Sequence, residues 1–149
     1  MSGKREQESA SGRPSVSAVL ETCLYVDDLD EASRFYEGLF GWMQMVGDER
    51  MRAYGVAHGS VLLLFKRGAT AQPVTTPGGI IPAHDGVPGG HIAFAIAGSD
   101  WDPWLRRLKE RGVSVERIVN WPRGGRSLYF RDPEQNLVEL ATPGLWAVY

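Results

Sequence analysis

Residues 127–141 read SLYFRDPEQNLVELA and predict two strands joined by a tight turn. A proline restricts the turn, and the side chains of Asp132 and Asn136 can bond to the backbone nearby. In the second strand, residues 137–141, side chains alternate between two faces, which places Glu139 among apolar neighbours. A buried carboxylate is costly unless it is paired, hydrogen-bonded or bound to a metal. Glu139 therefore needs a partner elsewhere in the chain.

The composition excludes several classes of protein. With 149 residues, 43% hydrophobic and 23% charged, the chain is long enough for one domain with a core. A net charge of −2 gives no reason to expect nucleic acid or an anionic membrane as partner. The single cysteine, Cys23, excludes an intrachain disulfide and fits a reducing, cytoplasmic setting. No apolar run approaches the ~20 residues that span a bilayer. Residues 1–15 are polar, lack the apolar run of a signal peptide, and predict a disordered tail.

Beyond the tail, the chain repeats one order of elements: strand, helix and three strands. The first copy covers about residues 16–66 and the second about residues 90–143. Between them, residues 66–90 are rich in Gly, Pro and Thr without periodicity, which predicts a functional loop or a linker. We therefore predict an α+β fold with one domain over residues 16–149. In it, two tandem βαβββ modules form a curved mixed sheet around a shared cleft.

Hydrophobic periodicity and local turn signals give the expected elements. Two helices are expected, one over residues 29–40 and one from about residue 99 to residue 112. The expected strands are residues 16–26, 42–46, 52–57 and 61–65 in the first module, and residues 91–96, 113–119, 127–130 and 137–141 in the second.

The repeat brings four positions together in the shared cleft. Aligning the two modules places Glu21 on His91 and Leu63 on Glu139. Three of these four are metal-binding types, and one imidazole with two carboxylates can form an open three-point metal site. The alternatives are ordinary ones, because His91 can be a strand-edge histidine and Glu21 can pair with an arginine at the strand end.

The pattern resembles the vicinal oxygen chelate superfamily, also called the glyoxalase/bleomycin-resistance/dioxygenase family. The resemblance covers residues 16–143 and implies that Glu21, His91 and Glu139 bind a divalent metal. It also implies that Glu21 or Glu139 serves as a catalytic general base. The stretches that carry it are ETCLYVDDL (21–29), FY (35–36), LFG (39–41), GHIAF (90–94), FRDP (130–133) and VEL (138–140).

The ligand set narrows the chemistry that this resemblance implies. Two carboxylates favour Mn, Ni, Zn or Mg over the redox iron that suits two histidines and one carboxylate. Glyoxalase I enzymes commonly carry a fourth ligand where this chain has Leu63, which argues against that activity. The resemblance implies a metal-dependent lyase, isomerase or thiol transferase that chelates vicinal oxygens of a small substrate. The alternative is a non-catalytic protein of the bleomycin-resistance type that sequesters an antibiotic.

Further residues are expected to border the site or to join two chains. The strand at 127–130 resembles that of fosfomycin thiol transferases, whose serine and tyrosine approach the substrate. The expected partners are a small molecule, either anionic or a thiol adduct, and a second copy in a homodimer. His84 is expected to be a solvated loop histidine, with a lid or ligand role as alternatives. The candidate substrate-binding residues are Arg126, Ser127, Tyr129, Trp121, Arg123 and Cys23, and for the arginines surface charge is an equal alternative.

Overall fold

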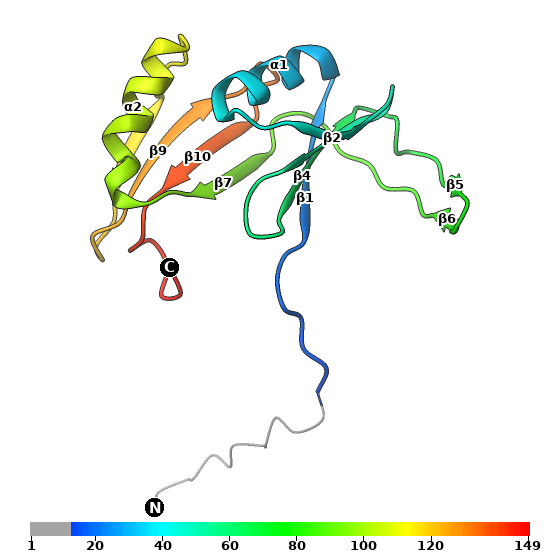
Figure 1. Ribbon diagram of the computed structural model, residues 1–149, viewed down its shortest axis with the longest axis horizontal. Coiled ribbons are helices and arrows are strands. Elements are labelled where there is room, and N and C mark those ends of the chain that lie inside the picture. The colour runs from blue at the N-terminus through cyan, green and yellow to red at the C-terminus, as the bar shows by residue number, and fades with distance from the viewer. Residues whose placement is uncertain (1–12) are drawn as a thin grey trace, which may run out of the picture.

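The computed structural model describes residues 13–149. In it, each module forms its own four-stranded sheet, with strand orders β1-β4-β3-β2 and β7-β10-β9-β8 (Figure 1). The predicted α+β class and the two βαβββ modules are confirmed, with two sheets where one continuous curved sheet was expected. The first module contains β1 (Glu21–Val26), α1 (Leu29–Phe40), β2 (Gln44–Gly47), β3 (Met51–Gly55) and β4 (Val61–Lys66). The second contains β7 (His91–Ala95), a 3₁₀ helix η1 (Gly98–Asp100), α2 (Trp101–Glu110), β8 (Arg117–Asn120), β9 (Arg126–Arg131) and β10 (Leu137–Ala141).

The strand register makes the two modules equivalent. β1 pairs in parallel with β4, which sets Glu21 opposite Val61, and β7 pairs in parallel with β10, which sets His91 opposite Leu137. Leu63 and Glu139 each lie two residues further along their strands. They therefore occupy matching places, as the alignment of the two halves predicts.

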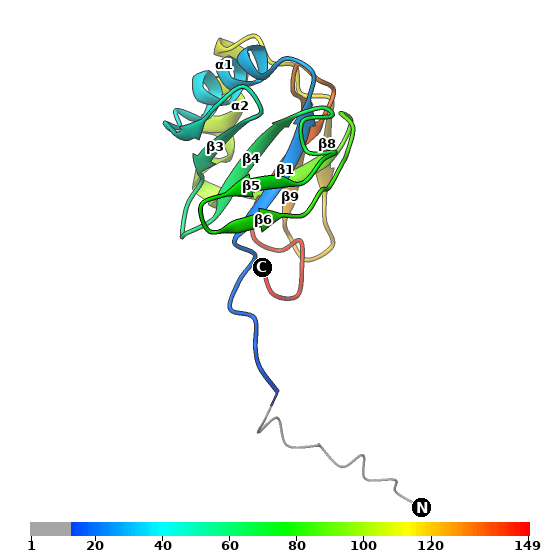
Figure 2. The same ribbon diagram turned by 90° about the vertical axis from the view of Figure 1, so that its right-hand side faces the viewer.

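The two helices are fixed by local signals and cover one side of the sheets. The Asp28 side chain accepts a hydrogen bond from the Glu31 N–H at 2.9 Å and caps α1. The helix ends at Gly41, whose φ of 73° suits a residue without Cβ. In both Figure 1 and Figure 2 the helices lie on the same side of the molecule, and Arg107 of α2 donates to the Leu39 carbonyl of α1. The core lies between this side and the sheets, where Leu62 and Leu64 of β4 and Val138 and Leu140 of β10 are fully buried.

Three expected elements differ from the structure. β1 begins at Glu21, because residues 16–20 are extended and exposed without a partner strand. The strand expected at 113–119 is the shorter β8. The loop at 66–90 contains a hairpin, β5 (Val74–Thr76) and β6 (Gly79–Ile81), which projects from the first module and lies in front of β1 and β4 in Figure 2. The two strands of this hairpin, joined by a Pro-Gly turn, are too short to show an alternating pattern in the sequence.

A buried carboxylate joins the two modules. Asp132, in the turn between β9 and β10, is 2% exposed and accepts a hydrogen bond from the Tyr36 hydroxyl of α1 at 2.9 Å. Its other oxygen accepts from the backbone N–H groups of Glu134 and Asn136, both at 2.9 Å. The sequence predicted only the local bonds, so the bond to Tyr36 is what makes the turn a connection between modules.

Asn136 extends this network to the N-terminal end of β7. Its side-chain nitrogen donates to Asp132 at 2.9 Å and to the backbone carbonyl of Tyr25 in β1 at 3.4 Å. Its side-chain oxygen accepts from the N–H groups of Gly89 and Gly90 at 2.9 and 2.8 Å. The fully buried amide thus ties β1 and the residues before His91 to one turn.

The C-terminal segment docks against the second sheet through the hydroxyl of Tyr149. The Tyr149 hydroxyl lies 3.0 Å from the carbonyl oxygens of both Ile96 and Ala141. Trp146 and Val148 remain exposed. Among residues 13–149, no helix has the length and hydropathy to cross a bilayer.

The Tyr36 hydroxyl is expected to stabilise the contact between the modules. Replacing Tyr36 by Phe should lower the free energy of unfolding by about 1.5–3 kcal/mol, because the buried carboxylate loses a donor. Tyr54→Phe is the control, since its hydroxyl donates to Glu37, which is partly exposed and can bond to water instead. Urea unfolding measures both variants, and an equal or larger loss in Tyr54→Phe would contradict the assignment.

The same contact predicts a dependence on alkaline pH. Burial and the neighbouring Asp132 carboxylate raise the pKa of Tyr36 well above its ordinary value of 10.0. Its contribution to stability is therefore complete below about pH 10, the unfolded value, and is lost as pH rises towards the folded value. The unfolding free energy of the wild type should fall more steeply above that pH than that of Tyr36→Phe.

Candidate functional site

His91 and Glu139 lie together on the face of the second sheet that is turned away from α2. Because His91 is opposite Leu137 in the register, Glu139 lies two residues along the neighbouring strand on the same face. His91 Nε2 is 3.3 Å from Glu139 Oε2. Half of the histidine side chain is exposed, whereas the glutamate side chain is 6% exposed. The pair predicted from sequence is therefore assembled at the edge of the sheet.

The other ring nitrogen of His91 is held by the backbone. Nδ1 lies 3.0 Å from the carbonyl oxygen of Leu137. A carbonyl only accepts hydrogen bonds, so Nδ1 carries a proton in this arrangement. Nε2 then holds either a lone pair or a second proton. With a lone pair, Nε2 and the carboxylate form two neighbouring donors for a metal ion, oriented by a backbone contact that metal-bound histidines commonly have.

One oxygen of Glu139 is buried without a partner. Oε1 has no hydrogen bond in the described part of the chain, and the residue is only 5% exposed. A buried carboxylate oxygen left without a partner is destabilising. The imidazole nitrogen and the carboxylate oxygens form a donor set that suits Mn, Ni or Zn. The two residues therefore supply donor atoms that fit a divalent metal.

Tyr129 of β9 lies beside this pair. It is directly opposite Glu139 in the antiparallel register, and its ring centroid is 6.3 Å from that of His91. Burial, followed by the Glu139 carboxylate, raises the pKa of Tyr129. A tyrosine hydroxyl is protonated at neutral pH even without this shift, so Tyr129 can donate a hydrogen bond into the site.

Glu21 lies away from this pair in a single chain. It is the exposed first residue of β1, in the other sheet, and it forms no ion pair with another described residue. Among residues 13–149, no three His, Cys, Asp or Glu side chains form a group that could hold a metal ion. One chain therefore brings together two of the three predicted metal ligands.

The predicted substrate-binding residues of the second module divide between the two faces of β9. Ser127, on the face of Tyr129, is fully buried and accepts a hydrogen bond from Trp121 Nε1 at 2.9 Å. Arg126 lies on the opposite face, with its guanidinium 4.3 Å from the centre of the Trp101 ring. Arg123 is exposed in the turn between β8 and β9. Arg126 therefore packs on α2 and faces away from His91.

Cys23 lies on the open face of the first sheet, two residues from Glu21. It is opposite Leu63 in the register, and the residue is exposed. Partial burial of the thiol raises its pKa, a hydrogen bond with Tyr25 lowers it, and the Glu21 charge raises it, with burial having the largest effect. The net shift is upward, so the thiol is a weak nucleophile at neutral pH.

The structure assigns His84 a contact that the sequence did not predict. Its Nδ1 lies 2.5 Å from the Tyr25 hydroxyl, and its ring packs edge-on against Phe65 at 5.0 Å. Tyr25 follows Glu21 and Cys23 at period two on β1, which was the available signal for a polar partner on this face. The contact fixes the segment after the β5–β6 hairpin against the first sheet.

The comparisons with known proteins agree with this fold. Residues 18–140 match the model of the Glyoxalase/Bleomycin resistance protein/Dioxygenase superfamily. The chain is 30% identical to a metallothiol transferase FosB from Shouchella clausii over 85% of this chain and 81% of that protein. A metallothiol transferase FosB from Staphylococcus epidermidis is 25% identical, over 85% and 82% of the two chains.

A solved structure shows the same similarity in three dimensions. The crystal structure of a lactoylglutathione lyase from Agrobacterium tumefaciens aligns with a TM-score of 0.80 and 33% identity, over 89% of this chain and 98% of that chain. The match to the family model covers most of the chain, and two βαβββ modules are the architecture of its structural neighbours. The chain belongs to the glyoxalase/bleomycin resistance protein/dioxygenase superfamily.

Proposed function

We propose that this protein is a divalent-metal-dependent enzyme that acts on a small substrate with two adjacent oxygen atoms. The observation that carries the proposal is the His91–Glu139 pair, with its buried, unpartnered carboxylate oxygen. A metal ion bound there would act as a Lewis acid towards adjacent substrate oxygens.

A second copy of the chain is proposed to complete the site with its Glu21. In one chain Glu21 is exposed at the beginning of β1, an edge strand, and is preceded by exposed apolar residues Val16, Val19 and Leu20. His91 also lies on an edge strand with its side chain half exposed. Two copies related by a two-fold axis would exchange Glu21 reciprocally and form two identical sites. This arrangement would be the predicted homodimer.

The protein's own groups then have distinct roles. His91 and Glu139 hold the metal from one chain, and Glu21 holds it from the other. The Tyr129 hydroxyl, protonated at neutral pH, would donate a hydrogen bond to a substrate oxygen. Glu21 is the better candidate for the general base, because it would have to leave the metal to take a proton, and it is not packed into the sheet as Glu139 is.

Within this class we propose thiol transfer ahead of the lyase reaction. The apolar Leu63 occupies the place in the first module that Glu139 has in the second, so it supplies no fourth ligand. The similarity to two metallothiol transferases supports thiol transfer. The similarity to a lactoylglutathione lyase is the reason to assay the lyase reaction as well. The attacking thiol is proposed to come from the substrate, because the raised pKa of Cys23 makes it a weak nucleophile.

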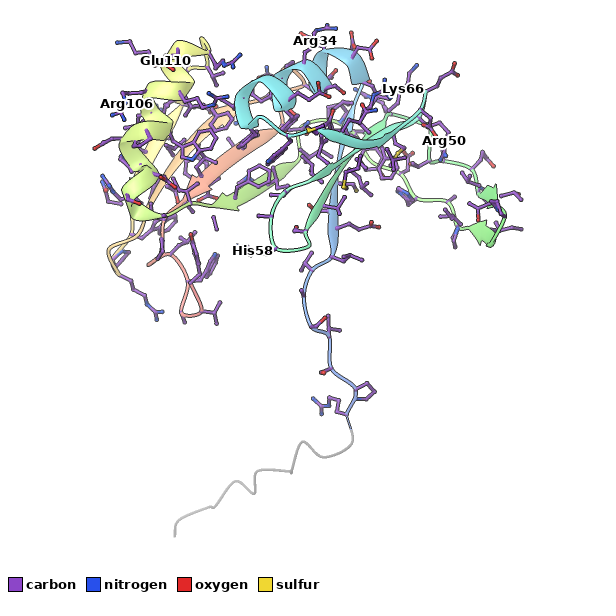
Figure 3. All side chains as sticks on the ribbon, viewed as in Figure 1. Arg34, Arg50, His58, Lys66, Arg106 and Glu110 are labelled. Carbon is purple, nitrogen blue, oxygen red and sulfur yellow. The ribbon has the colours of Figure 1, made fainter. Side chains whose placement is uncertain are left out.

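Metal content tests the proposal directly. Protein purified without chelators or a metal-affinity tag should contain about one divalent metal per chain, since a symmetric dimer has two equal sites. His91→Ala should lose the metal, whereas His58→Ala, in the exposed turn between β3 and β4 (Figure 3), should retain it. The loaded protein is then assayed with fosfomycin and several thiols, and with methylglyoxal–thiol adducts. A metal-free protein that binds an antibiotic equally well with or without His91 would instead support sequestration.

Sharing of the site between chains predicts complementation. Glu21→Gln and His91→Ala should each be inactive alone, because every site in either homodimer is damaged. After joint refolding in equal amounts, half of the dimers are mixed and carry one intact site, so metal binding should recover to about one quarter of wild type. Absence of recovery in dimers shown to be mixed would contradict the sharing of one site between two chains.

The Cys23 thiol is expected to react slowly. The rate of alkylation by iodoacetamide should rise with pH around a midpoint above the ordinary thiol value of 9.0, since burial and the Glu21 charge both raise the pKa. Glu21→Gln should move the midpoint down slightly, and Cys23→Ser should retain metal and activity. A midpoint well below 9.0 would identify Cys23 as an activated nucleophile and contradict this assignment.

A further inference from the structure

The buried side chain of Asn136 uses its whole hydrogen-bonding capacity on groups that are far apart in the chain. Its nitrogen donates to Asp132 Oδ2 at 2.9 Å and to the Tyr25 carbonyl at 3.4 Å. Its oxygen accepts from the N–H groups of Gly89 and Gly90 at 2.9 and 2.8 Å. A primary amide has two donors and one oxygen with two lone pairs, so all of its bonds are made. Only one orientation of the amide satisfies these contacts, because the opposite one would set its oxygen against the carboxylate.

One oxygen of Asp132 connects this amide to the first module. Asp132 Oδ2 accepts from Asn136 and from the Tyr36 hydroxyl of α1, each at 2.9 Å. Because Tyr36 belongs to the first module, this oxygen has both donors only when the two modules are docked. The Tyr25 carbonyl, in β1, is a second contact with the same module. The nitrogen side of the amide therefore depends on the docking of the modules.

The oxygen side of the amide leads to His91. The Gly90 N–H is held by Asn136, and the Gly90 carbonyl accepts from the Leu137 N–H at 2.8 Å. The Leu137 carbonyl in turn lies 3.0 Å from His91 Nδ1. Asn136 immediately precedes Leu137, and Gly90 immediately precedes His91. One side chain therefore fixes the backbone that carries the imidazole and the backbone that holds its Nδ1 proton.

We propose that Asn136 is a positioning residue for His91, through which the docking of the first module sets the metal affinity of the second. This role depends on the proposed metal function, since it concerns the affinity of the same site. Among the described residues, Asn136 has no hydrogen bond to the side chain of His91 or Glu139, so it acts through the backbone. By linkage, a bound metal ion favours the docked arrangement to the same extent.

Metal titration of two tyrosine variants tests the coupling between the modules. Tyr36→Phe removes one donor to Asp132 Oδ2 and should weaken the binding of Mn²⁺ and Zn²⁺ about fivefold, the lower end of the usual range for coupled sites. Tyr54→Phe is the matched control and should bind as wild type does, because its hydroxyl donates to Glu37, outside this network. Calorimetry of the full chain measures the affinities, and sedimentation verifies that all three proteins form the same assembly.

A double-mutant cycle tests whether the effect passes through Asn136. Asn136→Ala should weaken metal binding by about tenfold or more, as loss of a group that orients a metal-bound histidine commonly does. Adding Tyr36→Phe should then cost little more, because the path to His91 is already broken. Circular dichroism verifies folding, and if Asn136→Ala does not fold, the comparison of Tyr36→Phe with Tyr54→Phe decides.

The tautomer of His91 is a readout that needs no metal. In the wild type, the Leu137 carbonyl holds the proton on Nδ1. Nitrogen NMR of the metal-free protein at about pH 8, where histidine is ordinarily neutral, should show this tautomer. Asn136→Ala should give a mixture of both tautomers at His91, whereas the signals of His58, in an exposed turn, should not change.

Three results would overturn the proposal. Equal metal affinity of Tyr36→Phe and Tyr54→Phe would show that docking does not reach the site. Full additivity of Tyr36→Phe and Asn136→Ala would show two separate effects. An unchanged tautomer in folded Asn136→Ala would show that His91 is oriented without this amide. A wild type that binds no metal would instead overturn the proposed metal function, and the tautomer would still decide the role of Asn136.

Discussion

The buried carboxylate of Asp132 is the constraint on which the two-module arrangement depends. Its four hydrogen-bond donors come from α1 of the first module, from its own turn and from Asn136. A carboxylate this deeply buried is tolerated only when its oxygens are well supplied with donors. Because Tyr36 is one of them, the first module has to dock in one orientation to satisfy a group of the second.

The same turn sets the geometry of the candidate site. Asn136 bonds to the N–H groups of Gly89 and Gly90, the two residues before His91, and immediately precedes β10, which carries Glu139. The starting points of β7 and β10 are thus held by one side chain. The 3.3 Å approach of His91 to Glu139 follows from this shared anchor and the parallel register. Fold stability and site geometry are here properties of one network.

The sequence predicted best what local signals determine. α1 begins and ends where its capping aspartate and Gly41 indicate, because both act within one turn of the helix. The predicted start of β1 was wrong, because the point where a strand begins depends on whether a distant strand pairs with it. The face of Arg126 could have been predicted, because it shares period two with the buried Leu128 and Phe130. The bond between Tyr36 and Asp132 could not, since no local pattern relates a helix to a turn 96 residues away.

The place of Glu21 shows why an internal duplication does not by itself define a site. Equivalent strands of the two modules carry equivalent positions, yet each sheet in this chain is closed within its own module. The first module has Leu63 where the second has Glu139, so only the second can offer a buried carboxylate beside an imidazole. Each chain therefore carries one such pair and one exposed Glu21, which lie in different sheets. A reciprocal exchange across a two-fold axis uses every one of these groups, whereas a monomer leaves the oxygen of Glu139 unpartnered and Glu21 without an ionic partner among the described residues.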